Sequence, residues 1–142
     1  MVTRMLILIV EDQAIIGLAM AMELLDAGHE VLGPVTNIEA AERLAREARP
    51  DLALIDIDLQ RRGDGVDLAR VLRSGSRIQT LFVTGRPVVA RANADLALGV
   101  IEKPFVSSDI PRSIAVVQAI MDGCSPLRGE IPSQLELFRQ MH

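Results

Sequence analysis

Short apolar runs alternate along this chain with longer segments in which apolar residues recur at helical spacing. Near-continuous apolar runs are typical of strands that are buried on both faces of a parallel sheet. The runs that predict strands lie at 5–10, 30–34, 51–56, 78–83 and 98–102. The segments that predict helices lie at 13–27, 38–48, 66–73, 88–95 and, after a cap at Ser107, Ser108 and Asp109, up to 121. Five β/α repeats predict an α/β fold, with helices on both faces of a parallel sheet.

Local signals mark the ends of several of these helices. Gly28 is a good left-handed stop after the first helix, and Pro50 breaks the second. Asn37 can cap the second helix, with Glu39 in its first turn, where the helix dipole favours an acid. These signals support the order of the repeats.

The end of the chain differs in character from the repeats. At 142 residues the chain fits one domain with a sizeable core. From residue 123 onward glycine and proline become frequent, which is typical of a linker, and 134–139 predicts a short extra helix. We therefore predict a domain over 1–122 and a C-terminal tail over 123–142. Leu135, Leu137 and Phe138 in this tail offer a contact to a neighbouring subunit, which would make a homodimer.

The composition argues against direct binding of nucleic acid. There are three Phe, no Trp and no Tyr, so the core is expected to be aliphatic and stacking platforms are absent. The net charge is −4, and no cluster of Lys and Arg forms a phosphate-binding stripe. Arg61 and Arg62 are an isolated pair that we assign to a solvated loop.

Cysteine usage and hydropathy predict a cytoplasmic protein. The single cysteine, Cys124, has no partner for an internal disulfide bond, which suits a reducing compartment. The apolar run at 5–10 is too short for a secretory signal, and no run reaches the length of a membrane span. We expect Cys124 to be chemically idle and both His29 and His142 to be solvated.

Polar residues suited to metal and phosphate chemistry follow the predicted strands. Glu11 and Asp12 follow the first strand and Asp56 ends the third, while Thr84 ends the fourth and Lys103 follows the fifth. Ligands of doubly wound sheets bind beyond the carboxyl ends of the strands. Taken singly, each residue has a simpler explanation, such as an acidic helix start for Glu11 and Asp12. Together, three carboxylates, a hydroxyl and an ammonium predict a Mg²⁺-dependent phosphoryl site.

These residues carry a resemblance to a known family. The matching segments are Val10-Glu11-Asp12, Leu54-Ile55-Asp56, Gly65, Val83-Thr84-Gly85 and Lys103-Pro104-Phe105. In this order, on these strand ends, the chain resembles the receiver domain of bacterial two-component response regulators over about residues 4–122. The resemblance implies a flavodoxin-like, doubly wound sheet of five parallel strands in the order 2-1-3-4-5.

The resemblance also implies a role for each site residue. Asp56 would accept a phosphoryl group from a histidine kinase or a histidine phosphotransfer protein. Asp12, Asp56 and the backbone carbonyl of Asp58 would bind Mg²⁺, and Glu11 would help through a water. Thr84 and Lys103 would bind the transferred group, and the Lys103-Pro104 peptide bond would be cis. The protein would thus be a phosphoacceptor that assists transfer to its own aspartate, not an enzyme, and it would signal to a downstream protein.

The chain departs from the family pattern at two places. Val100 stands where the family usually has an aromatic switch residue, so the usual route of activation is in doubt. Asp58 and Arg86 lie two residues beyond Asp56 and Thr84, where family side chains flank the phosphorylation pocket. Because their charges are opposite, we hypothesise that Asp58 and Arg86 pair across the mouth of that pocket and gate hydrolysis.

The helix predicted at 13–27 carries more apolar residues than one buried face needs. They are Ile15, Ile16, Leu18, Met20, Met22, Leu24 and Leu25. In the family this helix helps to dock the histidine-bearing partner. Docking of a partner and burial under the last helix are both open interpretations.

Three alternative functions remain open. Asp56-Ile57-Asp58-Leu59 resembles the nucleophile motif of haloacid-dehalogenase-type phosphatases, although in that family the acidic pair comes later in the chain. A receiver-like module that is never phosphorylated is less consistent with the complete set of site residues. Twenty residues follow residue 122, too few for a DNA-binding domain, which favours a stand-alone receiver. A receiver cut from a longer transcriptional regulator is the third alternative.

Overall fold

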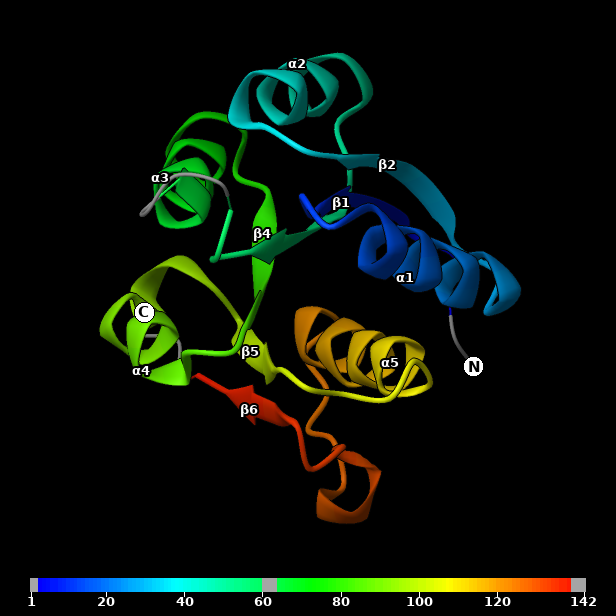
Figure 1. The fold of residues 1–142 in the computed structure, drawn as a ribbon. Helices are drawn as coiled ribbons and strands as arrows, with labels where there is room; N and C mark the ends of the chain where they lie inside the picture. Colours follow the sequence, from blue (N-terminus) through cyan, green and yellow to red (C-terminus); the bar gives the residue numbers. More distant parts are fainter. Residues whose placement is uncertain (1–2, 60–63, 139–142) are drawn as a thin grey trace.

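A computed structural model describes residues 3–59 and 64–138, in which a six-stranded sheet lies between two layers of helices (Figure 1). The strands are β1 (Leu6–Val10), β2 (Glu30–Val35), β3 (Leu52–Asp56), β4 (Gln79–Thr84), β5 (Gly99–Glu102) and β6 (Leu135–Leu137). The helices are α1 (Ala14–Asp26), α2 (Ile38–Ala48), α3 (Asp64–Val71), α4 (Pro87–Ala92) and α5 (Asp109–Met121). A π-helical turn follows α3 at Leu72–Ser76, and 3-10 turns lie at Ala94–Leu96 and Arg128–Glu130.

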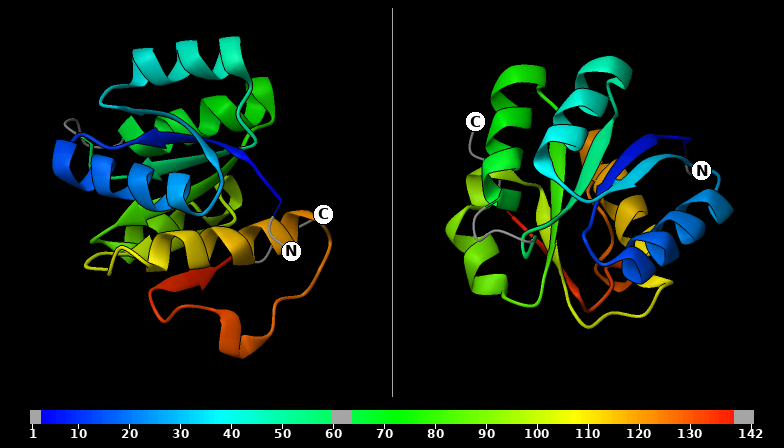
Figure 2. Two further views of the ribbon diagram at one scale, coloured as in Figure 1. Left: turned by 90° about the vertical axis from the view of Figure 1, so that its right-hand side faces the viewer. Right: turned by 45° about the horizontal axis from the view of Figure 1, so that its top comes forward.

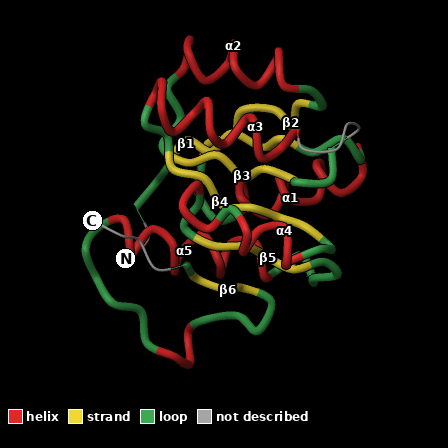
Figure 3. The backbone as a smooth tube through the Cα atoms, turned by 90° about the vertical axis from the view of Figure 1, so that its left-hand side faces the viewer, coloured by secondary structure: helices red, strands yellow, loops and turns green. Residues whose placement is uncertain are grey.

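The sheet has the strand order β2-β1-β3-β4-β5-β6. The strands β1 to β5 pair in parallel, so the doubly wound α/β arrangement and the order 2-1-3-4-5 are confirmed for them. The predicted total of five strands is wrong, because β6 adds an antiparallel strand to the edge of β5 (Figure 3).

β6 stands where the sequence predicts a short helix over 134–139, of which residue 139 lies outside the described residues. An isolated helix of this length is unstable, because forming its first turn fixes several backbone dihedral angles and gains only one hydrogen bond. The open edge of β5, by contrast, offers a row of unpaired backbone groups. Leu135 and Leu137 pair with Ile101 and Gly99 of that edge. Figure 2 shows the tail leaving the end of α5, turning, and returning to the sheet.

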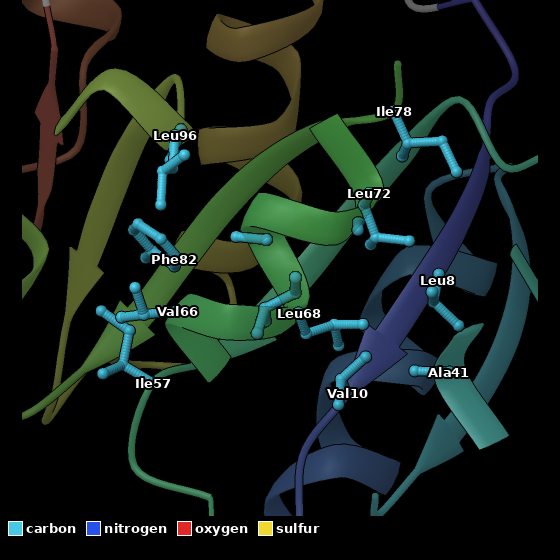
Figure 4. Packing of buried hydrophobic residues seen from close by; sticks show 14 of the residues in the cluster. Leu8, Val10, Ala41, Ile57, Val66, Leu68, Leu72, Ile78, Phe82 and Leu96 are labelled. Carbon is cyan, nitrogen blue, oxygen red and sulfur yellow. The ribbon is translucent and has the colours of Figure 1, made fainter. Parts of the chain in front are cut away.

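Two aliphatic clusters hold the layers together. On one face, α2, α3 and α4 cover buried residues that include Leu8, Ile55 and Phe82 (Figure 4). On the other face, α1 and α5 cover a cluster that includes Ile7 and Leu54. Neighbouring residues such as Ile7 and Leu8 belong to opposite clusters because successive side chains of a strand point to opposite faces. Both faces of the central strands are therefore dry, as their continuous apolar runs indicate.

Local caps account for several helix boundaries. The side chain of Asn37 accepts a hydrogen bond of 2.9 Å from the amide of Ala40, and α2 has the predicted bounds. At α5, Ser108 makes no capping hydrogen bond; instead Asp109 Oδ2 accepts one of 3.2 Å from the amide of Val106. The bond from Val106 ties the loop before α5 to the first residue of that helix, so the side-chain cap predicted at Ser107, Ser108 and Asp109 does not form. None of the described helices has both the length and the apolarity that crossing a membrane requires.

The prediction that His29 is solvated is wrong. His29 is buried, and its Nδ1 accepts a hydrogen bond of 3.1 Å from the amide of Met5. Burial lowers the pKa of His29, which keeps the ring neutral and able to accept this bond. The ring joins the turn before β2 to the segment that leads into β1. Cys124 is exposed, and its predicted chemical idleness stays a prediction. Arg61, Arg62 and His142 lie outside the described residues.

Gly65 allows the start of α3 to approach the end of β3. A Cβ at residue 65 would lie 2.5 Å from the carbonyl oxygen of Asp56 and 2.8 Å from the Cα of Ile57. We expect Gly65→Ala to lower the free energy of unfolding by about 1–3 kcal/mol, because backbone atoms must shift. Gly85→Ala is the matched control, since its Cβ meets no atom within 4 Å. Urea unfolding of the two variants measures the difference, and equal stabilities would contradict the expectation.

Candidate functional site

The carboxyl ends of β1 and β3 bring three acids together. Carboxylate oxygens of Glu11, Asp12 and Asp56 all lie within 4.8 Å of one another. Glu11 and Asp56 are buried, and Asp12 is partly exposed. Buried carboxylates this close repel one another unless a proton or a cation joins them, and an all-oxygen donor set suits Mg²⁺. The residues present therefore fit the implied ion: Asp12 and Asp56 would hold it directly, and Glu11 would hold it through water.

Lys103 lies against two of these acids. Its Nζ is 3.3 Å from Asp56 Oδ2 and 3.5 Å from Glu11 Oε2. Its amide donates a hydrogen bond of 2.9 Å to the carbonyl of Thr84, which fixes the chain between β5 and α5. Burial works to lower the pKa of Lys103, but the charges of Asp56 and Glu11 outweigh it and raise the pKa. The ammonium is therefore held charged beside Asp56.

Glu11 has an unusual electrostatic position. Burial and the nearby charge of Asp56 raise the pKa of Glu11 to about 7, although the amide of Gln13 and the ammonium of Lys103 oppose the shift. In the metal-free protein this carboxyl group is thus partly protonated near neutral pH. A bound cation would compete with that proton, because both neutralise the same cluster.

The raised pKa of Glu11 predicts a pH dependence of stability in the absence of metal. A folded-state pKa of about 7, against 4.5 for an ordinary glutamate, favours the protonated folded form. The contribution is therefore fully present at low pH and is lost as the pH rises through the folded-state pKa. We expect the melting temperature in EDTA to fall between about pH 5 and pH 8, and Glu11→Gln to reduce that fall. The prediction would be contradicted if the melting temperature of the wild type rose over this pH range and Glu11→Gln behaved in the same way.

A hydrogen-bonded network occupies the end of β4. Thr84 Oγ1 donates to Asp58 Oδ2 at 2.8 Å and accepts from the amide of Arg86 at 2.9 Å. Arg86 in turn binds Asp58 Oδ1 through Nε at 3.0 Å and through Nη2 at 2.7 Å. The ion pair between Asp58 and Arg86 is the one that the opposite charges of the two residues predict from the sequence. The bond between Thr84 and Asp58 is not predicted by the sequence, because it depends on the direction of two side chains.

The same network sets the ionisation of Asp58. Partial burial works to raise the pKa of Asp58, but hydrogen bonds from Arg86, Thr84 and Gly85 outweigh it and lower the pKa. Asp58 is therefore a carboxylate at neutral pH. Its carboxylate engages the Thr84 hydroxyl, while the amide of Asp58 donates a bond of 2.8 Å to Asp56 Oδ1.

Val100 lies in the core and not at the site. It is 1% exposed and pairs with Phe82 of β4 on one side and Glu136 of β6 on the other.

The Lys103-Pro104 peptide bond is cis, as the resemblance implies. A second cis bond, Gly33-Pro34, is not predicted by the sequence.

The apolar load of α1 is divided between core and surface. Met20 and Leu24 are buried, whereas Ile15 is 85% exposed and Leu18, Met22 and Leu25 are more than half exposed. Beside the exposed residues a groove of about 420 Å³ runs between α1 and the start of α5, and Lys103 is part of its lining. Apolar surface is therefore continuous with one wall of the site.

Comparisons with known proteins agree with this geometry. The sequence model of the family described as the response regulator receiver domain matches residues 7–115. Transcriptional regulatory protein PdtaR of Mycobacterium tuberculosis (strain ATCC 25618 / H37Rv) is 32% identical over 134 residues, which are 92% of this chain and 64% of that protein. Transcriptional regulatory protein PhoP of Escherichia coli (strain K12) is 30% identical over 147 residues, covering 96% of this chain and 62% of that protein. The chain thus spans less than two thirds of the length of these curated relatives.

Solved structures show the same fold. The signal receiver domain of a modulated diguanylate cyclase from Desulfovibrio desulfuricans G20 is 32% identical, with a TM-score of 0.71, and the match covers 84% of this chain and 99% of that chain. The response regulator PhyR from Brucella abortus matches with a TM-score of 0.75 over 85% of this chain and 50% of that chain; at 21% identity this is a likeness of fold. On the match of the family model and the identity to bacterial response regulators, the chain belongs to the response regulator receiver domain family.

Proposed function

We propose that this protein is a response regulator whose receiver domain accepts a phosphoryl group on Asp56 from a histidine kinase or a histidine phosphotransfer protein. The observation that carries the proposal is the position of Asp56, a buried carboxylate that contacts Lys103 and adjoins Glu11 and Asp12. A carboxylate in this setting is a nucleophile whose repulsion from phosphoryl oxygens is screened on two sides.

The transfer breaks one bond and forms one. A carboxylate oxygen of Asp56 attacks phosphorus, the bond from phosphorus to the donor imidazole nitrogen breaks, and its electron pair stays on the imidazole. Mg²⁺, when bound by Asp12, Asp56 and the Asp58 carbonyl, supplies positive charge at the phosphoryl oxygens. Lys103 supplies a second positive charge beside Asp56, and the Thr84 hydroxyl binds the group once it leaves Asp58. Because the transition state is loose, catalysis here consists of positioning and charge neutralisation.

Acetyl phosphate, a small phosphoryl donor, tests the proposal without a cognate kinase. The full chain is incubated with the donor in Mg²⁺ or in EDTA, and the modification is located by peptide mass spectrometry after reduction of the acyl phosphate. We expect one Mg²⁺-dependent modification, on Asp56. Modification of another residue, or none in Mg²⁺, would overturn the proposed function.

The groove beside α1 supports docking of the phosphoryl donor at this place. It is lined by apolar residues of α1, including Ile15 and Met20, and by Lys103 and Phe105 on the other side. Exposed apolar patches of this kind mark contacts with other proteins. A histidine-bearing segment seated in the groove would lie next to the lysine that contacts Asp56.

The gate formed by Asp58 and Arg86 is expected to set the lifetime of the acyl phosphate. The ion pair lies at the end of β4 beside the site, and Asp58→Asn keeps its shape while it removes the charge that holds Arg86. We expect the lifetime of the acyl phosphate to shorten by about two- to fivefold. A factor of this size corresponds to the free energy that an exposed ion pair contributes. The measurement follows the decay of phosphorylated protein after removal of acetyl phosphate. An unchanged lifetime would remove the gating role.

The output that we propose is contact with a downstream protein, in the cytoplasm and without direct binding of nucleic acid. Residues 135–138 return to the sheet edge and pair with β5, so this part of the tail lies against the receiver fold. The curated relatives are longer transcriptional regulators, and this chain is similar to part of each. A search for proteins that bind only the beryllofluoride-treated chain tests this output, and specific retention of the chain on DNA would contradict it.

A further inference from the structure

The strand β6 closes the edge of β5 at the place where Val100 replaces the usual aromatic residue. Its backbone pairs with Gly99, Val100 and Ile101. Beyond these pairs, the amide of Glu102 donates to Gln134 at 2.8 Å and the amide of Phe138 donates to Leu98 at 2.9 Å. Leu135 enters the α5 side of the core and Phe138 packs on the α4 side, so the strand touches both helical layers.

Gly99 lies in close contact with the backbone of β6. A Cβ at residue 99 would collide with the backbone carbonyl oxygen of Glu136 and would also lie 3.3 Å from the Cα of Leu137. The three atoms nearest to such a Cβ all belong to the backbone of β6. Glycine weakens the interior of a strand and marks a close approach of another backbone. Its presence here is explained by the docking of β6.

Two polar tethers join β6 to the walls of the phosphoryl site. Arg91 of α4 holds Glu136 with both Nε and Nη2, at 2.8 to 3.0 Å. Gln134 Nε2 donates to the carbonyl of Pro104, the residue after Lys103, at 2.8 Å. The ion pair between Arg91 and Glu136 thus holds α4, which follows Thr84 and Arg86 in the chain. The hydrogen bond from Gln134 holds the loop that carries Lys103.

The helix α4 links the first tether to Thr84 over a short distance. It has six residues, its N-terminal flanking residue is Arg86, and no side chain caps it. The amide of Arg86 is bound by Thr84 Oγ1. If the Thr84 hydroxyl turns to a phosphoryl group on Asp56, it leaves both Asp58 and the Arg86 amide, and the start of α4 loses the bond that positions it.

We propose that β6 is a releasable strand that reports the state of Asp56: docked on β5 in the unmodified protein, and freed when Thr84 and Lys103 turn to the phosphoryl group. This inference rests on the proposed function. A strand of three residues at a sheet edge opens at a lower cost in free energy than the core strands do. Because coupling is reciprocal, a docked β6 opposes modification of Asp56, and a weakened β6 favours it.

Amide hydrogen exchange on the full chain, with Mg²⁺ and beryllofluoride as the phosphoryl mimic, measures the release. We expect the amides of Phe138 and Glu102 to exchange about tenfold faster or more when the mimic is bound. Asp56→Asn treated in the same way is expected to show no change. Beryllofluoride that alters the amides around Asp56 but leaves Phe138 and Glu102 unchanged would overturn the releasable strand and leave the proposed function standing. Absence of any response to beryllofluoride would overturn the proposed function itself.

Matched variants test the reciprocal effect. Glu136→Gln removes the charge that Arg91 holds, and we expect it to raise the affinity for beryllofluoride by about two- to fivefold. Glu130→Gln alters an exposed acid in the same tail and is expected to leave the affinity unchanged. Gly99→Ala places a Cβ against the β6 backbone and is expected to raise the affinity more than Glu136→Gln does. An affinity that is unchanged or lowered in both Glu136→Gln and Gly99→Ala would overturn the coupling.

Discussion

Replacing Asp56 by asparagine is expected to abolish Mg²⁺-dependent transfer of a phosphoryl group from acetyl phosphate to the protein. Asparagine keeps the size of the side chain but has no anionic oxygen to attack phosphorus. It also removes one of the three carboxylates that lie within 4.8 Å of one another, so the site loses a ligand for the cation together with its nucleophile. The measurement is the fraction of phosphorylated chain by intact-protein mass spectrometry.

The control for this variant is Asp26→Asn, an exposed acid at the C-terminal end of α1, the end of the helix opposite Asp12. It is expected to be modified like the wild type. Asp56→Asn should also be at least as stable as the wild type in EDTA, because it removes the negative charge that, with burial, raises the pKa of Glu11. Undiminished labelling of Asp56→Asn at another residue would place the chemistry elsewhere and contradict the assignment.

The convergence of the site could be predicted from the sequence because it depends on topology alone. Carboxyl ends of parallel strands meet at one edge, so residues that end β1, β3, β4 and β5 must lie near one another. Glu11 and Lys103, separated by 92 positions, come within 3.5 Å in this way. The partner of Thr84 could not be predicted by the same argument, because its hydroxyl turns to Asp58 and not to Asp56, a choice made by side-chain rotation.

The fate of the tail could not be predicted from local pattern. Residues 134–138 contain too few positions to separate a strand from a helix by periodicity. The outcome depends on Leu98 to Glu102, more than thirty positions earlier, whose outer edge is free to accept a strand. Gly99 was the one local signal, since a glycine within an apolar strand indicates a close approach of another backbone. His29 is a similar case: its partner is the amide of Met5, which lies 24 positions earlier in the chain.

Replacing Lys103 by methionine is expected to slow phosphorylation of Asp56 by acetyl phosphate by about 10²–10³-fold, the loss that removal of one transition-state donor causes. The Nζ of Lys103 lies 3.3 Å from Asp56 Oδ2, and the side chain is only 20% exposed, so water cannot fully replace its charge. Methionine keeps the length and packing of the stem while it removes the ammonium. The rate constant of labelling in saturating Mg²⁺ measures the effect.

Lys103 is the single lysine of the chain, which allows the same prediction to be tested by a direct signal. With ¹⁵N-lysine labelling, the protein should give one ammonium resonance that shifts when beryllofluoride and Mg²⁺ are added, and Asp56→Asn should remove that shift. Arg112→Met on α5 is the control for loss of a positive charge, since Arg112 pairs with Asp109 at 3.7 Å and does not contact the site. If Lys103→Met and Arg112→Met are both labelled at the wild-type rate, the ammonium beside Asp56 neutralises the two acids for the stability of the fold and does not assist transfer.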